Sequence, residues 1–91
     1  EAEKLVGEEL KGLIITVQSY GLFVELPKLF IEGLVHVSTL NDDWYEYRSR
    51  QNLLIGRKSK NTFRVGDLIN IKILKVDILK YQIDLELINK P

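Results

Sequence analysis

Hydrophobic and polar residues alternate along most of this chain with a period of two. In the segment 21–26, Leu22, Val24 and Leu26 alternate with Phe23 and Glu25. Comparable segments, rich in valine, isoleucine and leucine, lie at 9–18, 21–26, 33–37, 68–77 and 81–88. A period of two is typical of half-buried β-strands. The pattern therefore predicts five strands, and no helix of more than two turns.

A change of phase interrupts the fourth predicted strand. Ile69, Ile71 and Ile73 share one face, whereas Leu74 and Val76 take over the apolar role after them. A slip of one residue indicates a β-bulge, which lets a strand bend around the corner of a small barrel.

Turn residues and one long connection separate the strands. The turns are Ser19-Tyr20-Gly21, Pro27-Lys28, Asn41-Asp42-Asp43 and Gly66-Asp67. The connection at 41–66 follows the third strand, and its segments 45–47 and 53–55 predict a small extra hairpin. Five short strands with a long third connection predict an all-β fold, a five-stranded antiparallel Greek-key barrel of the OB type with a small insertion between strands 3 and 4. An open sheet would leave edges that so short a chain cannot cover.

Length and composition place the chain among small soluble domains. Its 91 residues predict one domain, 1–91, because so short a chain cannot supply two cores. The lack of cysteine excludes disulfides and thiolate metal sites, and it favours a cytoplasmic location. There is no apolar run of about 20 residues and no signal-peptide pattern, so we expect no membrane partner. The chain starts at Glu1 without a methionine, so we expect a piece of a longer protein. We also expect the domain to be a monomer.

The charges balance overall but are unevenly distributed. The chain has 13 basic and 13 acidic residues, yet six of the basic ones and no acid lie between Arg48 and Arg64. The other seven basic residues face all 13 acids, so the remainder of the chain carries −6. A local basic field acts over about 8–10 Å at physiological salt. Two interpretations of this segment stay open. Its residues Arg57, Lys58, Lys60 and Arg64 either make secondary contacts with RNA phosphates or belong to a solvated loop.

Strand parity identifies a candidate binding surface. If the second and third strands turn their aliphatic residues into the core, Phe23 and His36 both point to solvent. A turn centred between residues 29 and 30 would set them opposite each other, with Tyr20 at the mouth of the hairpin. Either residue alone more often has a core, dimer-contact or idle surface role. Together they form a flat surface on which unpaired bases can stack, at roughly 1–3 kcal/mol per base.

Two segments, Gly12–Val24 and Glu32–Ser38, closely resemble the S1 RNA-binding domain family. That family is an OB-fold with an aromatic residue on each side of a turn glycine and a Gly-Leu-Val-His-x-Ser strand. The resemblance implies a domain that binds single-stranded RNA with little sequence preference. It implies RNA contacts at Tyr20, Phe23, His36, Asp77 and the position of Tyr81.

Two of these positions stay open. Many family members carry a basic residue where this chain has Tyr81, which cannot pair with phosphate; either Lys80 substitutes for it, or Tyr81 stacks. Asp77 has the wrong charge for phosphate. It either accepts a hydrogen bond from a 2′-hydroxyl or a base, or orients a neighbouring cation, or is a turn residue at the end of a strand.

A finer resemblance points to the C-terminal S1 domain of bacterial ribonuclease R. Its motifs are Phe30–Gly33, Asp43–Tyr47, Leu54–Gly56, Thr62–Asp67 and Gln82–Asp84. It implies a parent that hydrolyses RNA from the 3′ end, with magnesium-binding acids in a separate catalytic domain. This domain would hold RNA beside the catalytic and other RNA-binding domains. We expect the aromatic residues of the insertion, Trp44, Tyr45 and Tyr47, to pack it onto the barrel.

The chain itself predicts no catalytic residue, metal site or cofactor. Its one histidine has no serine or cysteine partner at a recognisable spacing, there is no glycine-rich phosphate loop, and the acids form no ligand set. Two alternatives remain. One is an S1 domain of a translation, transcription or phosphorolytic RNA-decay protein. The other is a barrel that docks onto a protein domain, which the zero net charge favours. A small independent enzyme has no support in the sequence.

Overall fold

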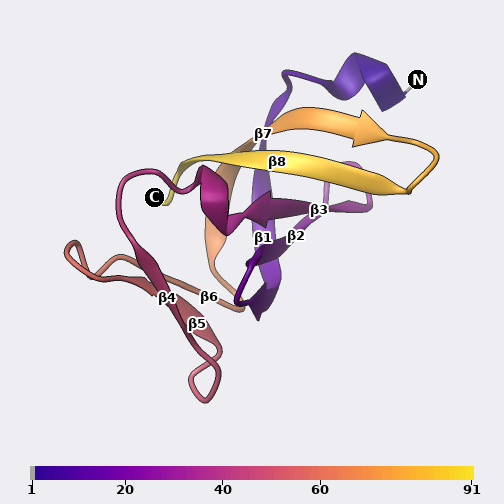
Figure 1. Cartoon of the computed structure of the whole chain (residues 1–91). Helices are drawn as coiled ribbons and strands as arrows, with labels where there is room; N and C mark the ends of the chain where they lie inside the picture. Colours follow the sequence, from indigo (N-terminus) through magenta and orange to yellow (C-terminus); the bar gives the residue numbers. More distant parts are fainter. Residues whose placement is uncertain (1) are drawn as a thin grey trace.

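Five strands close into a barrel in the computed structural model, which describes residues 2–91 (Figure 1). They are β1 (Glu9–Gln18), β2 (Gly21–Leu26), β3 (Ile31–His36), β7 (Leu68–Asp77) and β8 (Gln82–Asn89). Their order around the ring is β1-β2-β3-β8-β7. The predicted five-stranded OB-type barrel with an insertion is confirmed, although β3 begins two residues earlier than predicted, at Ile31.

The barrel is mixed, and not wholly antiparallel as the sequence analysis predicts. Four neighbouring pairs of strands run antiparallel, whereas β3 and β8 run parallel. The reason is one of parity, because directions cannot alternate all the way round a closed ring with an odd number of strands. This parallel seam joins Leu34 to Asp84 and Val35 to Leu85.

The long connection forms a second sheet of three strands, β4 (Tyr45–Arg48), β5 (Leu53–Gly56) and β6 (Thr62–Arg64). The predicted hairpin is confirmed as β4 and β5, and β6 is an addition to it. The β4–β5 turn projects away from the barrel (Figure 1). Two 3-10 helices complete the described elements, η1 (Ala2–Leu5) and η2 (Val37–Thr39). Neither of them, nor any other helix in residues 2–91, is long and apolar enough to span a bilayer.

One apolar core fills the barrel and continues under the insertion. Around the ring, Leu22, Val35, Leu85 and Ile73 face one another in register and are almost completely buried. Leu54 of β5 and Phe63 of β6 belong to the same core, which fixes the insertion to the barrel. No polar or charged side chain is buried among the residues described. Binding groups are therefore found on the outside of the barrel.

The predicted bulge in β7 is confirmed. The register with β8 shifts between Ile73 and Lys75, which leaves Leu74 partly exposed. A second bulge, which the sequence analysis did not predict, lies in β1 between Ile14 and Thr16. The β7 bulge sets Lys75 opposite Asp84, beside the parallel seam.

Candidate nucleic-acid interface

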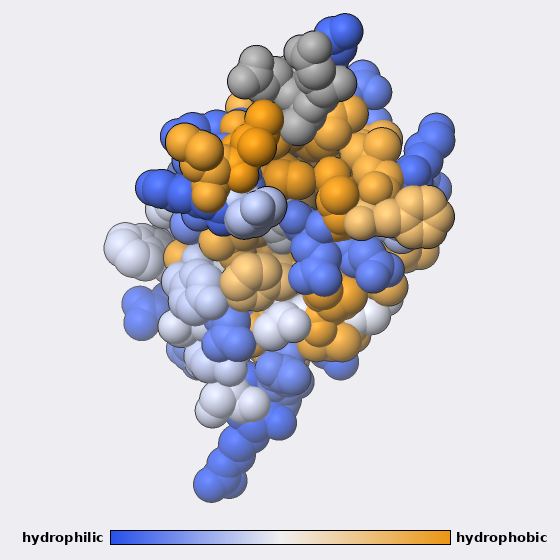
Figure 2. Space-filling model, turned by 90° about the vertical axis from the view of Figure 1, so that its right-hand side faces the viewer, coloured by the Kyte–Doolittle hydropathy of each residue, from blue (hydrophilic) through white to orange (hydrophobic). Residues whose placement is uncertain are grey.

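A groove of about 420 Å³ lies on the outer face of the barrel. It is lined by Tyr20, Phe23, Glu32, Gly33, Leu34, His36, Tyr81, Gln82 and Ile83, and we call it the aromatic groove. Strands β2, β3 and β8 supply most of the lining, and the β1–β2 and β7–β8 turns complete it. Figure 2, in which the β7–β8 turn faces the viewer, shows hydrophobic side chains gathered over the barrel and mostly hydrophilic ones over the insertion below.

Phe23 and His36 project from the same outer face, as parity predicts, but they are not directly opposite each other. Phe23 pairs with Leu34, and His36 pairs with Gly21, so the predicted register is wrong by two residues. The β2–β3 turn, residues 27–30, is centred one residue earlier than predicted. A shift of two residues preserves the face of every side chain, and both residues therefore still reach the aromatic groove.

Gly21 lets the two strands approach closely at this point. A β-carbon at Gly21 would clash with the carbonyl oxygen of Val35, so a larger residue does not fit between β2 and β3. Just outside this pair, the N–H of Val37 donates to the carbonyl oxygen of Tyr20 over 2.8 Å. The backbone of Tyr20 is thereby held beside the end of β3, next to His36.

The two aromatic rings of the β1–β2 hairpin lie at right angles. The ring centroids of Tyr20 and Phe23 are 6.0 Å apart, and the interplanar angle is 88°. Leu34 is buried next to Phe23, as its cross-strand partner. Because perpendicular faces cannot both lie flat against one base, this pair offers stacking surfaces of two different orientations.

Asp84 is a groove-side acid that the sequence analysis did not identify as a site residue. Its Oδ1 lies 3.7 Å from Nε2 of His36 and accepts a hydrogen bond of 2.9 Å from the amide of Gln82. Strand alternation would have placed it on the outer face of β8. Nothing in the sequence brings it to His36, however, because the parallel seam creates that proximity.

Three of the predicted RNA contacts lie at the last residue of β7 and in the β7–β8 turn. Tyr81 lines the aromatic groove, is 95% exposed and has a left-handed backbone with φ 51°. Asp77 accepts a hydrogen bond of 3.1 Å from the N–H of Lys80, as a turn residue does. Neither Asp77 nor Lys80 lines the groove. Their contacts with RNA stay predictions.

The basic residues of the insertion lie apart from the aromatic groove. Arg57, Lys58, Lys60 and Arg64 are all exposed, and none of them lines it. The reason is topological, because they belong to the second sheet and its turns. Lys58 lines a neighbouring hollow together with Ser19 of the barrel.

The aromatic residues of the insertion have different roles. Tyr45 packs against Phe63 with ring centroids 5.5 Å apart, and its hydroxyl donates to the carboxylate of Asp42. Burial, and then that hydrogen bond, raise the pKa of Tyr45 to about 12. Tyr47 is half-buried against the core. The packing prediction is thus confirmed for these two tyrosines but wrong for Trp44, which is 79% exposed.

Asp43 organises the β5–β6 turn. Its Oδ2 accepts hydrogen bonds from the N–H of Ser59 at 2.8 Å, the hydroxyl of Ser59 at 2.9 Å and the N–H of Lys58 at 3.0 Å. Its Oδ1 accepts from the N–H of Trp44 at 2.7 Å. These donors, the N–H of Ser59 above all, outweigh desolvation and lower the pKa of Asp43 to about 2.

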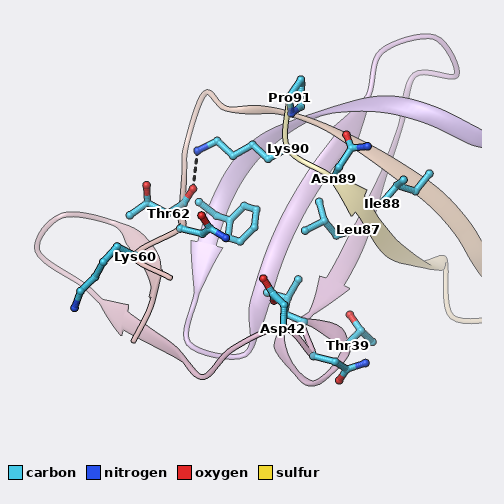
Figure 3. A pocket seen from close by; sticks show the side chains of 13 residues that line it. Thr39, Asp42, Lys60, Thr62, Leu87, Ile88, Asn89, Lys90 and Pro91 are labelled. Atoms are coloured by element: carbon cyan, nitrogen blue, oxygen red, sulfur yellow. Dashed lines mark hydrogen bonds between the residues drawn. The ribbon is translucent and has the colours of Figure 1, made fainter. Parts of the chain in front are cut away.

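A second hollow, of about 650 Å³, lies between η2, the insertion and the end of β8 (Figure 3). There the amine of Lys90 donates to the carbonyl oxygen of Thr62 at 2.6 Å and lies 2.9 Å from the carboxylate of Asp67. Desolvation opposes ionisation of Asp67, but the hydrogen bond and charge of Lys90 and the N–H of Arg64 outweigh it, so its pKa is lowered. Lys90 thus ties β8 to the insertion. Across residues 2–91, no group of three or more possible metal ligands is found.

Comparisons with known proteins show which family this chain is similar to. The family model described as "S1 RNA binding domain" matches residues 3–88. The acetazolamide conferring resistance protein zam of Synechocystis is 51% identical over 98% of this chain and 12% of its own length. Ribonuclease R of Escherichia coli is 40% identical over 92% of this chain and 10% of its own length. The chain therefore spans only about a tenth of the curated relatives it matches.

Solved structures show the same likeness. Mycoplasma genitalium ribonuclease R, in its apo form, superposes with a TM-score of 0.87 at 27% identity, covering 93% of this chain and 13% of that one. The same values hold for that enzyme in complex with ribose-methylated single-stranded RNA.

Proposed function

Since this chain belongs to the S1 RNA-binding domain family, we propose that it binds single-stranded RNA across the aromatic groove with little sequence preference. The observation that carries the proposal is the convergence of Tyr20, Phe23 and His36 on one outer groove. Every base has a flat face, so stacking on these rings tolerates any sequence. The RNA complex of the Mycoplasma enzyme supports single-stranded RNA as the ligand.

The charges around the groove indicate that stacking contributes more than phosphate neutralisation. Glu32 lines the groove, and Asp84 lies beside His36. Lys75 is opposite Asp84 in the register, and Lys80 is exposed in the β7–β8 turn. With acids and bases in balance, few counterions are released on binding, and the affinity should depend only weakly on salt.

The parent protein, in this proposal, is a hydrolytic exoribonuclease of the ribonuclease R type that works from the 3′ end. Identities of 39–46% to ribonuclease R of several bacteria, over more than nine-tenths of the chain, support this assignment. The domain would hold RNA for its neighbours in the cytoplasm. Catalysis, and the magnesium that the resemblance implies for it, are assigned to parts of the parent outside these 91 residues.

One observation favours a second function, docking onto a neighbouring protein domain. The β7–β8 turn exposes Ile78, Leu79 and Tyr81, and Leu79 is 93% exposed. Large apolar side chains clustered at one turn are a feature of protein contact sites. In this alternative, RNA binding by the isolated chain would be weak.

The proposal is tested by titrating a labelled oligo(A) with the chain and following fluorescence anisotropy. Phe23→Ala and His36→Ala should each weaken binding about five- to 100-fold, as expected for the loss of one stacking partner. Phe30→Ala is the matched control, because Phe30 is 92% exposed and lies outside the aromatic groove. Unchanged affinity in both groove variants, with an unchanged melting curve, would exclude this groove as the RNA site.

A further inference from the structure

A third hollow, of about 710 Å³, lies between the barrel and the insertion. Ser19, Val37 and Ser38 line its barrel side, and Trp44 and Lys58 line its insertion side. We call it the tryptophan groove. None of these five residues lines the aromatic groove.

The two grooves meet at one end of the β2–β3 pair. Ser19 precedes Tyr20, and Val37 follows His36, while Tyr20 and His36 line the aromatic groove. The hydrogen bond from the N–H of Val37 to the carbonyl oxygen of Tyr20 holds the two segments together at 2.8 Å. A strand of RNA that leaves the aromatic groove past Tyr20 and His36 would therefore next meet Ser19 and Val37 of the tryptophan groove.

The backbone of Trp44 is held by hydrogen bonds, whereas its side chain is exposed to solvent. Its N–H donates to Asp43 at 2.7 Å, and its carbonyl oxygen accepts from the N–H of Arg57 at 2.8 Å. The side chain nevertheless belongs to no core cluster and leaves Trp44 79% exposed. A large flat ring on a rigid support loses little conformational entropy when a base stacks on it.

Two acids and one base line this groove, and a second base adjoins it. Asp42 and Asp43 line it, and their oxygens already accept hydrogen bonds from Tyr45 and from the β5–β6 turn. Lys58 lines it as well, and the exposed Arg57 precedes Lys58. The chemistry of the groove therefore fits a stacked base with one phosphate near Lys58, and it does not fit a purely ionic site.

We propose that the tryptophan groove is a second nucleotide subsite, in which RNA continuing from the aromatic groove stacks a base on Trp44. This inference rests on the proposed function. It adds a direction to that function, because the RNA would run from the outer face of the barrel onto the insertion.

Trp44 is the only tryptophan in the chain, so its intrinsic fluorescence reports directly on this subsite. OB-folds bind from about 4 to 16 nucleotides, so oligo(A) of about 4 and about 12 nucleotides separates the two grooves. We expect the long oligonucleotide to quench Trp44, and the short one to bind the aromatic groove without quenching. This measurement needs no substitution in the chain.

Trp44→Leu should weaken binding of the long oligonucleotide about five- to 100-fold and leave the short one unaffected. Lys58→Gln should reduce only the affinity for the long oligonucleotide, by a smaller factor, and Lys28→Gln serves as its charge-matched control outside both grooves. Phe23→Ala should weaken the binding of both oligonucleotides.

The outcomes separate the two proposals. Suppose that Phe23→Ala weakens binding, while RNA does not quench Trp44 fluorescence and Trp44→Leu does not change the affinity. The subsite proposal is then wrong and the proposed function stands. If neither residue matters for RNA, both proposals fail. An equal loss for both lengths in Trp44→Leu would also overturn the subsite. So would Trp44 fluorescence that ignores RNA but shifts to the blue when a protein domain of the parent is added.

Discussion

The rings of Tyr20 and Phe23 meet edge to face, with centroids 6.0 Å apart and planes at 88°. Each ring therefore limits the positions that the other can take. The geometry also gives the two rings separate roles, because only one of them can lie flat against a given base. Phe23 lies in the strand beside Leu34, whereas Tyr20 lies in the turn and is half exposed.

Substitutions of Tyr20 should distinguish its ring from its hydroxyl. Tyr20→Phe keeps the ring and should leave RNA affinity within about twofold. Tyr20→Ala removes one stacking surface and the edge contact with Phe23, and it should weaken RNA binding about five- to 100-fold. Isothermal titration with oligo(A) measures both. A loss in Tyr20→Phe as large as in Tyr20→Ala would show that the hydroxyl, and not the ring, binds RNA.

Asp84→Asn should strengthen RNA binding. The substitution removes a negative charge beside the aromatic groove, while the amide oxygen still accepts the hydrogen bond from Gln82. At 3.7 Å, Asp84 orients His36 only weakly, so the change in charge should dominate. For a phosphate several ångströms away in a hydrated groove, we expect a gain of less than about fivefold.

The salt dependence of the affinity distinguishes the charge effect of Asp84 from its effect on the orientation of His36. The gain in Asp84→Asn should shrink as salt is raised, because screening weakens a through-space charge effect. Weaker binding at every salt concentration would instead show that the carboxylate positions His36 for the ligand.

The β5–β6 turn should loosen in acid. The pKa of Asp43 is about 2 in the folded chain, against 3.8 ordinarily. Its contribution to stability is therefore fully present above the ordinary value, and it is lost as the pH falls towards about 2. The amide signals of Lys58 and Ser59, which donate to Asp43, should shift over that range in an NMR titration.

Asp43→Asn should produce the same loosening at neutral pH, because an amide cannot accept all of these hydrogen bonds. The matched control is Asp42→Asn, because within the described part of the chain the Asp42 carboxylate accepts only from the hydroxyl of Tyr45. If the turn amides of Asp43→Asn were as protected from hydrogen exchange as those of the native chain, Asp43 would not organise the turn.

Gly21→Ala should affect both the fold and the site. The added methyl group would clash with the carbonyl oxygen of Val35, and overpacking of this kind costs roughly 1–3 kcal/mol of unfolding free energy. Urea unfolding measures that loss. Because Gly21 pairs with His36, a displaced β3 would also weaken RNA binding. Gly66→Ala is the control, since its methyl group meets open space, and only its backbone, at φ 96°, is unfavourable. It should leave RNA affinity unchanged.

The alternation of residues was enough to predict the barrel and the face of the site. Leu22 and Val24 identify the inner face of β2, and this directs Phe23 outward whatever the register. The register itself depends on the four turn residues 27–30, in which Phe30 takes a left-handed conformation, φ 56°, that apolar patterning does not encode. That is why the predicted register, which sets Phe23 opposite His36, is wrong by two residues.

Other features depend on contacts between distant parts of the chain. In the sequence, Asp84 is an ordinary solvent-facing residue of a strand. In the folded barrel, the parallel seam places it next to His36. Trp44 looks like a packing residue because large aromatics are usually buried, yet Tyr45 and Phe63 already fill the space under the insertion. The parallel seam follows from the odd number of strands in a closed ring, which residue alternation within single strands does not encode.

The seam has a consequence for how ligand and barrel depend on each other. The seam consists of two residue pairs, and it joins strands β1–β3 to strands β7 and β8, which are distant in the sequence. The aromatic groove has Leu34 on one side of this joint and Ile83 on the other. An oligonucleotide lying there would contact both β3 and β8, the two strands of the seam. Tighter RNA binding would then increase the free energy needed to separate these two strands.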